Sequence, residues 1–136
     1  SLVGSEMCIR DSHNFDRLKA ALADTTDKLI LPEPCENSRP SWFGFLITCK
    51  EGVDRNAVVQ YVEKKGVQTR MLFAGNLTKH PCFDQMRAEK RGYRVVGELT
   101  NTDRIMQDTF WVGVYPGMSD EMIDYMAATI REAINQ

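Results

Sequence analysis

One stretch in the middle of the chain gathers side chains that could meet a small ligand. Residues Phe73 to Pro81 read FAGNLTKHP. Gly75 would let the backbone approach a ligand closely, and the Asn76 amide can both donate and accept hydrogen bonds. His80 adds a titratable ring. The stretch can be interpreted in three ways: a sugar attachment site at Asn76-Leu77-Thr78, a phosphate cradle, or a loop that contacts a substrate.

Arg70 is a charge whose position needs an explanation. It lies in the apolar segment VQTRMLF, residues 67–73, which leads into this stretch. A buried charge is costly unless a partner or solvent meets it. Two environments would satisfy Arg70. One is an edge strand that turns the side chain towards water, and the other is a strand end that points the guanidinium at an anion near the loop.

No other residues form a recognisable catalytic arrangement. The chain has no glycine-rich nucleotide motif and no phosphate-loop motif, and His13 and His80 are far apart in sequence. No lysine lies in an apolar context that would lower its pKa for Schiff-base chemistry. Paired carboxylates are expected at helix ends or in solvent, namely Asp120/Glu121 and Asp24/Asp27. We therefore assign no catalytic residue and no metal ligand.

Composition narrows the class of protein. The chain has 136 residues, with 43% hydrophobic residues, 26% charged residues and a net charge of −2. This length suits one domain, and near-neutrality argues against nucleic acid as the main partner. No apolar run approaches the ~20 residues of a membrane span. The cysteines form no C-x-x-C pair and no zinc-like spacing, which favours a reduced, cytoplasmic protein. They are Cys8, Cys35, Cys49 and Cys82.

Apolar residues at helical spacing predict three main helices. The first begins near His13 and carries Phe15, Leu18 and Leu22 on one stripe. The second is capped by Asp54 and ends at Gly66, with a stripe of Val58, Val59 and Val62. Ser119 is expected to cap the last helix, whose stripe comprises Met122, Ile123, Met126, Ile130 and Ile134. Thr100-x-x-Asp103 resembles a capping box ahead of a further short helix.

Three apolar segments are predicted to be strands: residues 41–49, 67–73 and 109–115. Residues 83–92 are charged and aperiodic, which indicates an exposed excursion with some helix. Helices and strands thus alternate along the chain. This order predicts a two-layer α/β domain, in which helices cover a small sheet mainly on one face.

The first twelve residues, SLVGSEMCIRDS, differ in character from the rest. They show no clear periodicity, and they lack the basic start and long apolar core of a signal peptide. The string is similar to a peptide translated from sequencing-adapter DNA. We therefore expect residues 1–12 to be non-native and residues 13–136 to form the domain.

Four sequence blocks together carry a resemblance to a known family. They are SWFGF (41–45), TRMLFAGNLT (69–78), YRVVGELTNTDRIM (93–106) and DTFWVGVYPGMSDEM (108–122). From Pro40 onward the chain resembles the C-terminal domain of the DegT-type, PLP-dependent nucleotide-sugar aminotransferases. The likeness is strongest to the dehydratase branch, the CDP-4-keto-6-deoxyglucose 3-dehydratases of lipopolysaccharide biosynthesis. In the wider family the sequence of this loop resembles P-L-H-x-Q-P. Here Asn76-Leu77-Thr78 favours the dehydratases, and His80 stands where glutamine is usual.

The resemblance implies the small C-terminal domain of an aspartate-aminotransferase-like (type I PLP) fold. It also implies a separate cofactor domain that holds pyridoxal or pyridoxamine phosphate, so this segment alone is expected to be inactive. Some members carry an iron–sulfur cluster bound outside this region. The family is homodimeric and acts on nucleotide sugars. Substrate-binding roles are implied for Arg70, Phe73, Gly75, Asn76, Thr78 and His80, which makes the stretch a substrate loop and its glycosylation triplet a coincidence.

Two other functions remain open from the sequence. The chain could be a fragment of a PLP-dependent sugar aminotransferase, or a free-standing α/β binding module without catalysis. A cofactor-binding domain encoded in frame upstream of His13 would support an enzyme. A stop codon immediately upstream would support the module.

Overall fold

A small antiparallel sheet forms the centre of the molecule. The computed structural model describes residues 2–136, with side chains from Ile9 onward. The strands stand in the order β1-β2-β4-β3, and every neighbouring pair is antiparallel. Their bounds are β1 (Leu29–Ile30), β2 (Gly44–Cys49), β3 (Thr69–Met71) and β4 (Thr109–Gly113). The three predicted strands are confirmed, although each is shorter than its apolar segment.

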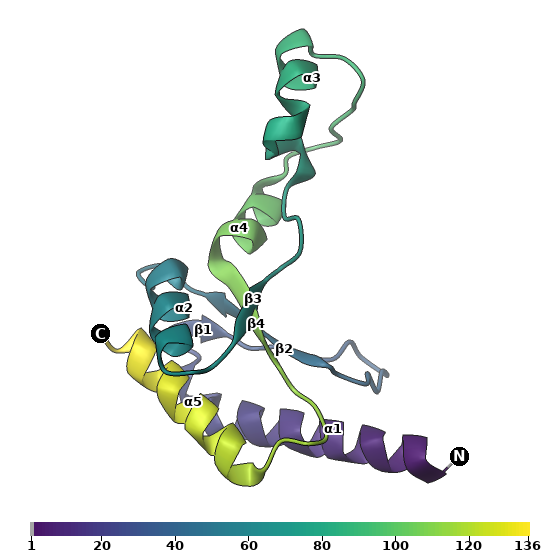
Figure 1. Ribbon diagram of the computed structural model, residues 1–136. Helices are drawn as coiled ribbons and strands as arrows, with labels where there is room; N and C mark the ends of the chain where they lie inside the picture. The colour runs from purple at the N-terminus through teal and green to yellow at the C-terminus, as the bar shows by residue number, and fades with distance from the viewer. Residues whose placement is uncertain (1) are drawn as a thin grey trace.

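Alternation along the strands gives the sheet an inner and an outer face. Phe45 pairs with Val112 and Ile47 with Phe110, and all four side chains are fully buried. The next residues along, Leu46 and Trp111, pair on the opposite, outer face, where burial is only partial. The inner face therefore belongs to the core, and the outer face is left without helices (Figure 1).

Three helices cover the inner face: α1 (Leu2–Ala21), α2 (Arg55–Lys64) and α5 (Asp120–Ile134). Their predicted apolar stripes are buried, including Phe15, Leu18 and Leu22 on α1 and Val58, Val59 and Val62 on α2. The last stripe is confirmed except at Met122, which is 48% exposed. The two-layer α/β prediction is thus confirmed.

Two predicted helix caps are confirmed and one is wrong. The Asp54 carboxylate accepts a hydrogen bond from the Asn56 backbone N–H at 2.8 Å, and Ser119 Oγ accepts from the Met122 N–H at 3.3 Å. By contrast, α4 (Thr100–Asp108) begins without any side-chain cap. The Asp103 carboxylate of the expected capping box bonds elsewhere, to side chains described below.

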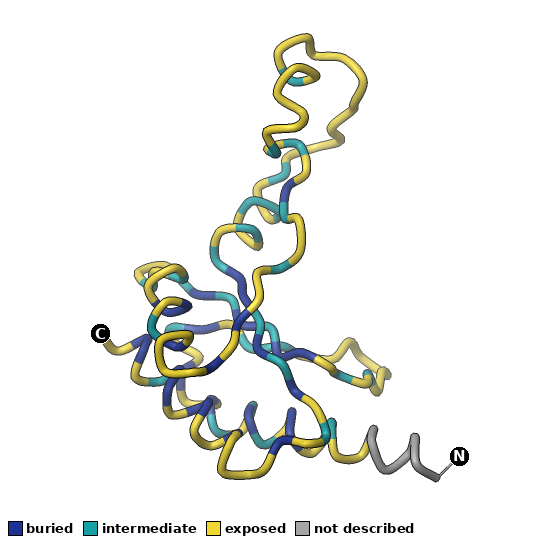
Figure 2. Tube along the Cα trace, viewed as in Figure 1, coloured by how far each residue is buried: buried dark blue, intermediate teal, exposed yellow. Residues whose placement is uncertain are grey.

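Between β3 and β4 the chain leaves the sheet as a long projection, residues 72–108, which we call the arm (Figure 1). It contains two short 3₁₀ turns (Leu77–Lys79 and Pro81–Phe83), α3 (Asp84–Glu89) and α4. Figure 2 shows that most of the arm is exposed. The predicted exposed excursion with some helix at residues 83–92 is therefore confirmed.

The first helix runs without interruption from Leu2 through the start of the predicted domain at residue 13. The non-native origin of residues 1–12 stays a hypothesis. Among the helices of the described chain, none combines the length and apolarity needed to cross a membrane.

Candidate substrate-binding loop

The loop that leaves β3, residues 73–80, begins with two unusual backbone conformations. Phe73 has a φ of 45° and Gly75 a φ of 60°. The left-handed region suits glycine, but it is uncommon for a bulky side chain such as phenylalanine. The Phe73 N–H donates to the Met71 carbonyl at 2.8 Å, and the Phe73 side chain is 79% exposed. The backbone thus turns sharply and presents an aromatic ring to the surroundings.

Asn76 holds the loop together from within. Its side-chain oxygen accepts from the Thr78 N–H at 3.0 Å and from the Thr78 hydroxyl at 2.6 Å. Its side-chain nitrogen donates to Asp103 Oδ1 at 2.7 Å, and the residue is only 3% exposed. Against expectation, the Asn76 amide is therefore turned away from the surface, because the loop itself uses its hydrogen-bonding groups.

Thr78 and His80 also bond within the arm. His80 Nε2 lies 2.5 Å from the Ala74 carbonyl oxygen, which ties the end of the loop to its start. Arg87 on α3 donates to the carbonyls of both Thr78 and His80, the latter at 2.9 Å. As the His-Pro sequence predicts, the His80 backbone is extended. The side chains that the loop leaves open are therefore mainly Phe73 and Leu77.

Two α4 residues that were not among the predicted site residues fix the loop from one side. Asp103 Oδ2 accepts from Lys79 Nζ at 2.7 Å, while Oδ1 accepts from Asn76. The hydrogen bond from Lys79 is the largest cause that lowers the pKa of the Asp103 carboxyl, and the hydrogen bond from Asn76 is the next largest. Met106 packs so closely that a Cβ on Gly75 would lie 2.4 Å from its Cγ. The glycine is thus needed for this approach as well as for its φ.

Arg70 occupies the first of the two environments considered for it. β3 is an edge strand, and Arg70 lies on it opposite Trp111, with its side chain exposed. Its guanidinium donates to the Thr69 carbonyl at 2.9 Å. The strand order places β3 at the margin of the sheet, which is the edge-strand environment. The exposed guanidinium remains accessible to an anion.

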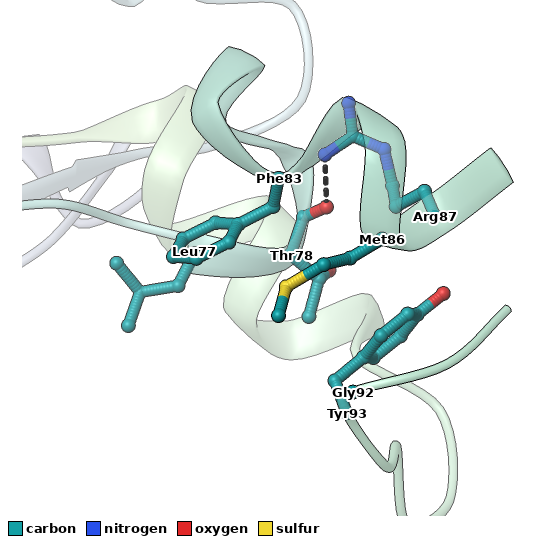
Figure 3. A pocket seen from close by; sticks show the side chains of 7 residues that line it. All are labelled: Leu77, Thr78, Phe83, Met86, Arg87, Gly92 and Tyr93. Atoms are coloured by element: carbon teal, nitrogen blue, oxygen red, sulfur yellow. Dashed lines mark hydrogen bonds between the residues drawn. The ribbon is translucent and has the colours of Figure 1, made fainter. Parts of the chain in front are cut away.

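Two apolar hollows flank this region. One, of about 360 Å³, lies on the outer sheet face, where its walls include Phe43, Trp111, Leu72 and Phe73. The other, of about 200 Å³, lies in the arm and is lined by Leu77, Thr78, Phe83, Met86, Arg87, Gly92 and Tyr93. Figure 3 shows the Phe83, Met86 and Tyr93 side chains around this second hollow, next to the loop.

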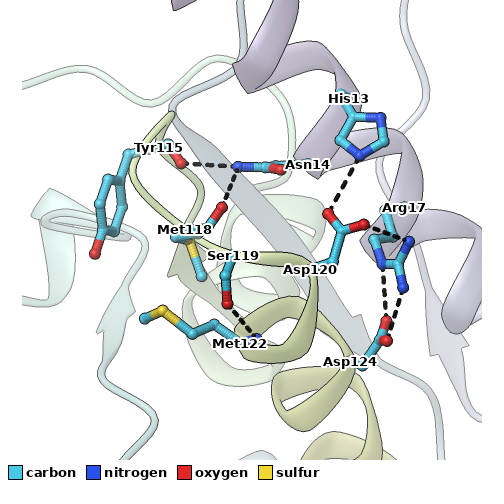
Figure 4. A network of polar contacts seen from close by, with 9 residues as sticks. All are labelled: His13, Asn14, Arg17, Tyr115, Met118, Ser119, Asp120, Met122 and Asp124. Atoms are coloured by element: carbon cyan, nitrogen blue, oxygen red, sulfur yellow. Dashed lines mark hydrogen bonds and ion pairs between the residues drawn. The ribbon is translucent and has the colours of Figure 1, made fainter.

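The carboxylates at the start of α5 serve helix packing. Asp120 contacts Arg17 at 3.0 Å and His13 at 3.4 Å, and Arg17 also pairs with Asp124 at 2.7 Å (Figure 4). The hydrogen bond from Arg17 lowers the pKa of the Asp124 carboxyl. These contacts join α1 to α5 on an exposed surface. Within the described residues, no three His, Cys, Asp or Glu side chains are grouped to hold a metal.

Comparison with known proteins identifies the family. The sequence model of the DegT/DnrJ/EryC1/StrS aminotransferase family matches residues 5–131. The chain therefore belongs to this family, as the resemblance predicted.

Two individual relatives are similar in sequence over most of this chain. The chain is 50% identical over 121 residues to the lipopolysaccharide biosynthesis protein RfbH of Salmonella typhimurium, covering 88% of this chain and 26% of that protein. It is 45% identical over 123 residues to a dTDP-4-dehydro-2,6-dideoxy-D-glucose 3-dehydratase of Saccharopolyspora spinosa. This match covers 89% of this chain and 25% of that protein. The chain thus spans about a quarter of the length of these relatives.

Solved structures confirm the aminotransferase-like fold. An E. coli GDP-4-keto-6-deoxy-D-mannose-3-dehydratase with bound hydrated PLP matches with a TM-score of 0.76 and 21% identity, over 93% of this chain and 31% of that one. A GDP-4-keto-6-deoxymannose-3-dehydratase with bound GDP-perosamine gives a TM-score of 0.78 and 22% identity, over the same 93% and 31%. The aminotransferase TlmJ from Streptoalloteichus hindustanus gives a TM-score of 0.77 and 19% identity, over 96% of this chain and 32% of that one.

Proposed function

We propose that this chain is the C-terminal part of a PLP- or PMP-dependent nucleotide-sugar 3-dehydratase of the CDP-4-keto-6-deoxyglucose type. Such an enzyme would work in the cytoplasm and make deoxysugars for lipopolysaccharide. The observation that carries this proposal is the identity of 45–50% to a lipopolysaccharide biosynthesis protein and a sugar 3-dehydratase, over nearly nine-tenths of the chain.

The part assigned to this segment is to bind and orient the sugar nucleotide. Arg70 offers an exposed guanidinium for the diphosphate, and Phe73, on the loop that follows β3, offers an exposed ring. Gly75, Asn76, Thr78 and His80 then shape the loop that carries Phe73. Orientation by such groups lowers the barrier of a reaction whose chemistry a cofactor performs.

The described residues do not form an anchor for the cofactor. Each partly buried lysine is already held by an oxygen: Lys19 by Glu33, Lys28 by the Ile134 carbonyl and Lys50 by the Thr26 carbonyl. The other lysines are exposed. We therefore place pyridoxal or pyridoxamine phosphate, and any iron–sulfur cluster, in a domain outside this segment.

A homodimer is part of the same proposal. Its support is the family resemblance, together with the apolar side chains that the arm leaves exposed, such as Val96 at 74% and Leu77 at 57%. Large exposed apolar residues on a projection are typical of surfaces that another protein surface covers.

The alternative within the family is a sugar aminotransferase, which the match to TlmJ supports at the level of the fold. A non-catalytic module is the remaining alternative. The test is to give the full-length protein PMP and CDP-4-keto-6-deoxyglucose and to analyse the product by mass spectrometry. A product without the C3 hydroxyl is expected. An amino sugar, formed with an amino donor, would identify an aminotransferase, and no product with any 4-keto sugar nucleotide would favour the module.

A further inference from the structure

We propose that Asp103 on α4 is a positioning residue, which sets the shape of the 73–80 loop and thereby the affinity for the sugar nucleotide. This inference rests on the proposed function. Asp103 would act through the loop rather than by touching the substrate. Met106, one helical turn further along α4, contacts the same loop.

The first argument is that the loop uses both oxygens of one carboxylate. Oδ1 accepts from the Asn76 side chain and Oδ2 accepts from Lys79 Nζ, each at 2.7 Å. Charge-assisted hydrogen bonds of this length are the stronger kind. The partners lie 27 and 24 residues before Asp103 in sequence, so the contact closes the arm upon itself.

The second argument is that Asn76 relays this contact to the loop backbone. The same amide that donates to Asp103 accepts from the Thr78 N–H and the Thr78 hydroxyl. If the amide rotates, all three bonds change together. The loop is therefore sensitive to the group that holds the Asn76 nitrogen, which is the Asp103 carboxylate.

The third argument is the fit of Met106 against the loop. Its sulfur accepts from the Asn76 backbone N–H at 3.3 Å, and its side chain fills the space beside Gly75. The strained turn at Phe73 leads directly into this contact. A backbone with φ above zero at a phenylalanine persists only where neighbouring contacts hold it. α4 supplies these contacts.

The test uses Asp103→Asn in the full-length protein. An amide at this position has one oxygen for two donors, so its NH2 group must face either the Asn76 amide nitrogen or Lys79 Nζ, and that donor loses its acceptor. The matched control is Asp108→Asn, which makes the same change on the same helix at a carboxylate near Arg104, 4.0 Å away, and away from the loop. Asp103→Glu keeps the carboxylate and serves as the conservative variant.

We expect Asp103→Asn to lower kcat/KM by about 10- to 100-fold, mainly through KM, because small misplacements of positioning groups have effects of this size. Hydrogen exchange in peptides covering residues 73–80 should become faster in the same variant. Asp103→Glu should recover part of the loss. Asp108→Asn should match the wild type in both measurements, and cofactor absorbance should be unchanged throughout.

Other results would overturn the inference. If Asp103→Asn lowers the melting temperature, or speeds exchange in the loop, while KM stays at the wild-type value well below the melting temperature, Asp103 is structural only. If KM rises equally in Asp108→Asn, the effect belongs to helix charge and not to the loop. Failure of the proposed function would look different, since the wild-type protein would then show no dehydration at all.

Discussion

The Trp111 ring of β4 lies directly over the backbone of Gly44 on the neighbouring strand β2. A Cβ on Gly44 would be 2.7 Å from Trp111 Cε3, which is closer than real Cβ contacts, and 3.1 Å from Cζ3. Phe43 then meets the same indole edge-on, with ring centroids 5.7 Å apart. Trp111 and Phe43 can therefore pack on the outer sheet face only because Gly44 has no side chain.

Gly44→Ala should destabilise this chain by about 1–3 kcal/mol, the usual cost of forcing a methyl group into a packed contact. The cross-strand partner of Gly44 is Gly113, where an added Cβ would meet nothing within 4 Å. Gly113→Ala is therefore the control, and it should be neutral or stabilise by about 0.4–1 kcal/mol. Urea unfolding of the two variants measures the difference, and equal destabilisation would contradict the packing argument.

The Cys49 thiol should be unreactive in the folded protein. It is 1% exposed, and burial raises its pKa to about 11. A raised pKa keeps the neutral thiol at pH 8, whereas the thiolate is the reactive form. Cys35 and Cys82 are exposed and should be labelled by iodoacetamide at once. Peptide mass spectrometry with and without urea checks this, and rapid labelling of Cys49 without urea would contradict it.

The same shift predicts a pH dependence with a definite sign. Since the ordinary thiol pKa is 9.0 and the folded value is about 11, the unfolded chain loses its proton first as pH rises. Stability should therefore be undiminished below about pH 9 and fall between pH 9 and 11. In this pH window the stability of the Cys49→Ser variant should fall less steeply than that of the wild type.

Arg70→Ala should weaken catalysis in the full-length enzyme without unfolding it. A charge-assisted hydrogen bond to an anion contributes roughly 1.5–3 kcal/mol, which is about ten- to over a hundredfold in kcat/KM. Because the side chain is exposed, the melting temperature should hardly change. Arg91→Ala, which removes an arginine of the arm that pairs with Glu89, is the control. A destabilised variant with normal turnover would refute the substrate role.

The isolated chain should bind neither PLP nor PMP in a defined ratio, because we place the cofactor in a domain outside this segment. Its partly buried lysines, which could otherwise form a Schiff base with the PLP aldehyde, are engaged by oxygens. Mixing the purified chain with PLP and recording the visible absorbance is the measurement. A stable stoichiometric band that survives dialysis would show that a cofactor anchor lies in this segment after all.

The full-length protein should be a homodimer, as the family resemblance implies and as is commonest among symmetric oligomers. Light scattering gives the mass in solution. Replacing the exposed Val96 by Asp, which places a charge on the arm, should shift the equilibrium towards monomer if the arm is part of the interface. A monomer in the wild type, at concentrations where the enzyme is active, would exclude this arrangement.

Most of the core could be predicted because its signals are local. The stripe of Phe15, Leu18 and Leu22 and the caps at Asp54 and Ser119 depend on spacing within one helix, and they are confirmed. Met122 is the exception because it is the first apolar residue of its stripe and lies in the first turn of α5, where the side chain falls outside the buried face.

The loop contacts could not be predicted, because they join residues that are distant in sequence. Asp103 has the spacing of a capping box, yet its carboxylate bonds to Asn76 and Lys79, which only the folded arm brings near. Arg70 had two possible environments because local pattern does not give the strand order. The substrate roles of Arg70, Phe73, Gly75, Asn76, Thr78 and His80 stay predictions.

The arm begins and ends at neighbouring positions of the sheet. Met71, the last residue of β3, pairs with Phe110 near the start of β4. The sheet therefore already holds both ends of residues 72–108 together, and the closure entropy depends only weakly on what lies between them, at about 0.6 kcal/mol for each doubling of length. Changes in the length of residues 72–108 should therefore cost the α/β scaffold little stability, so the arm is the part of the molecule that can be lengthened or shortened while the sheet beneath keeps its structure.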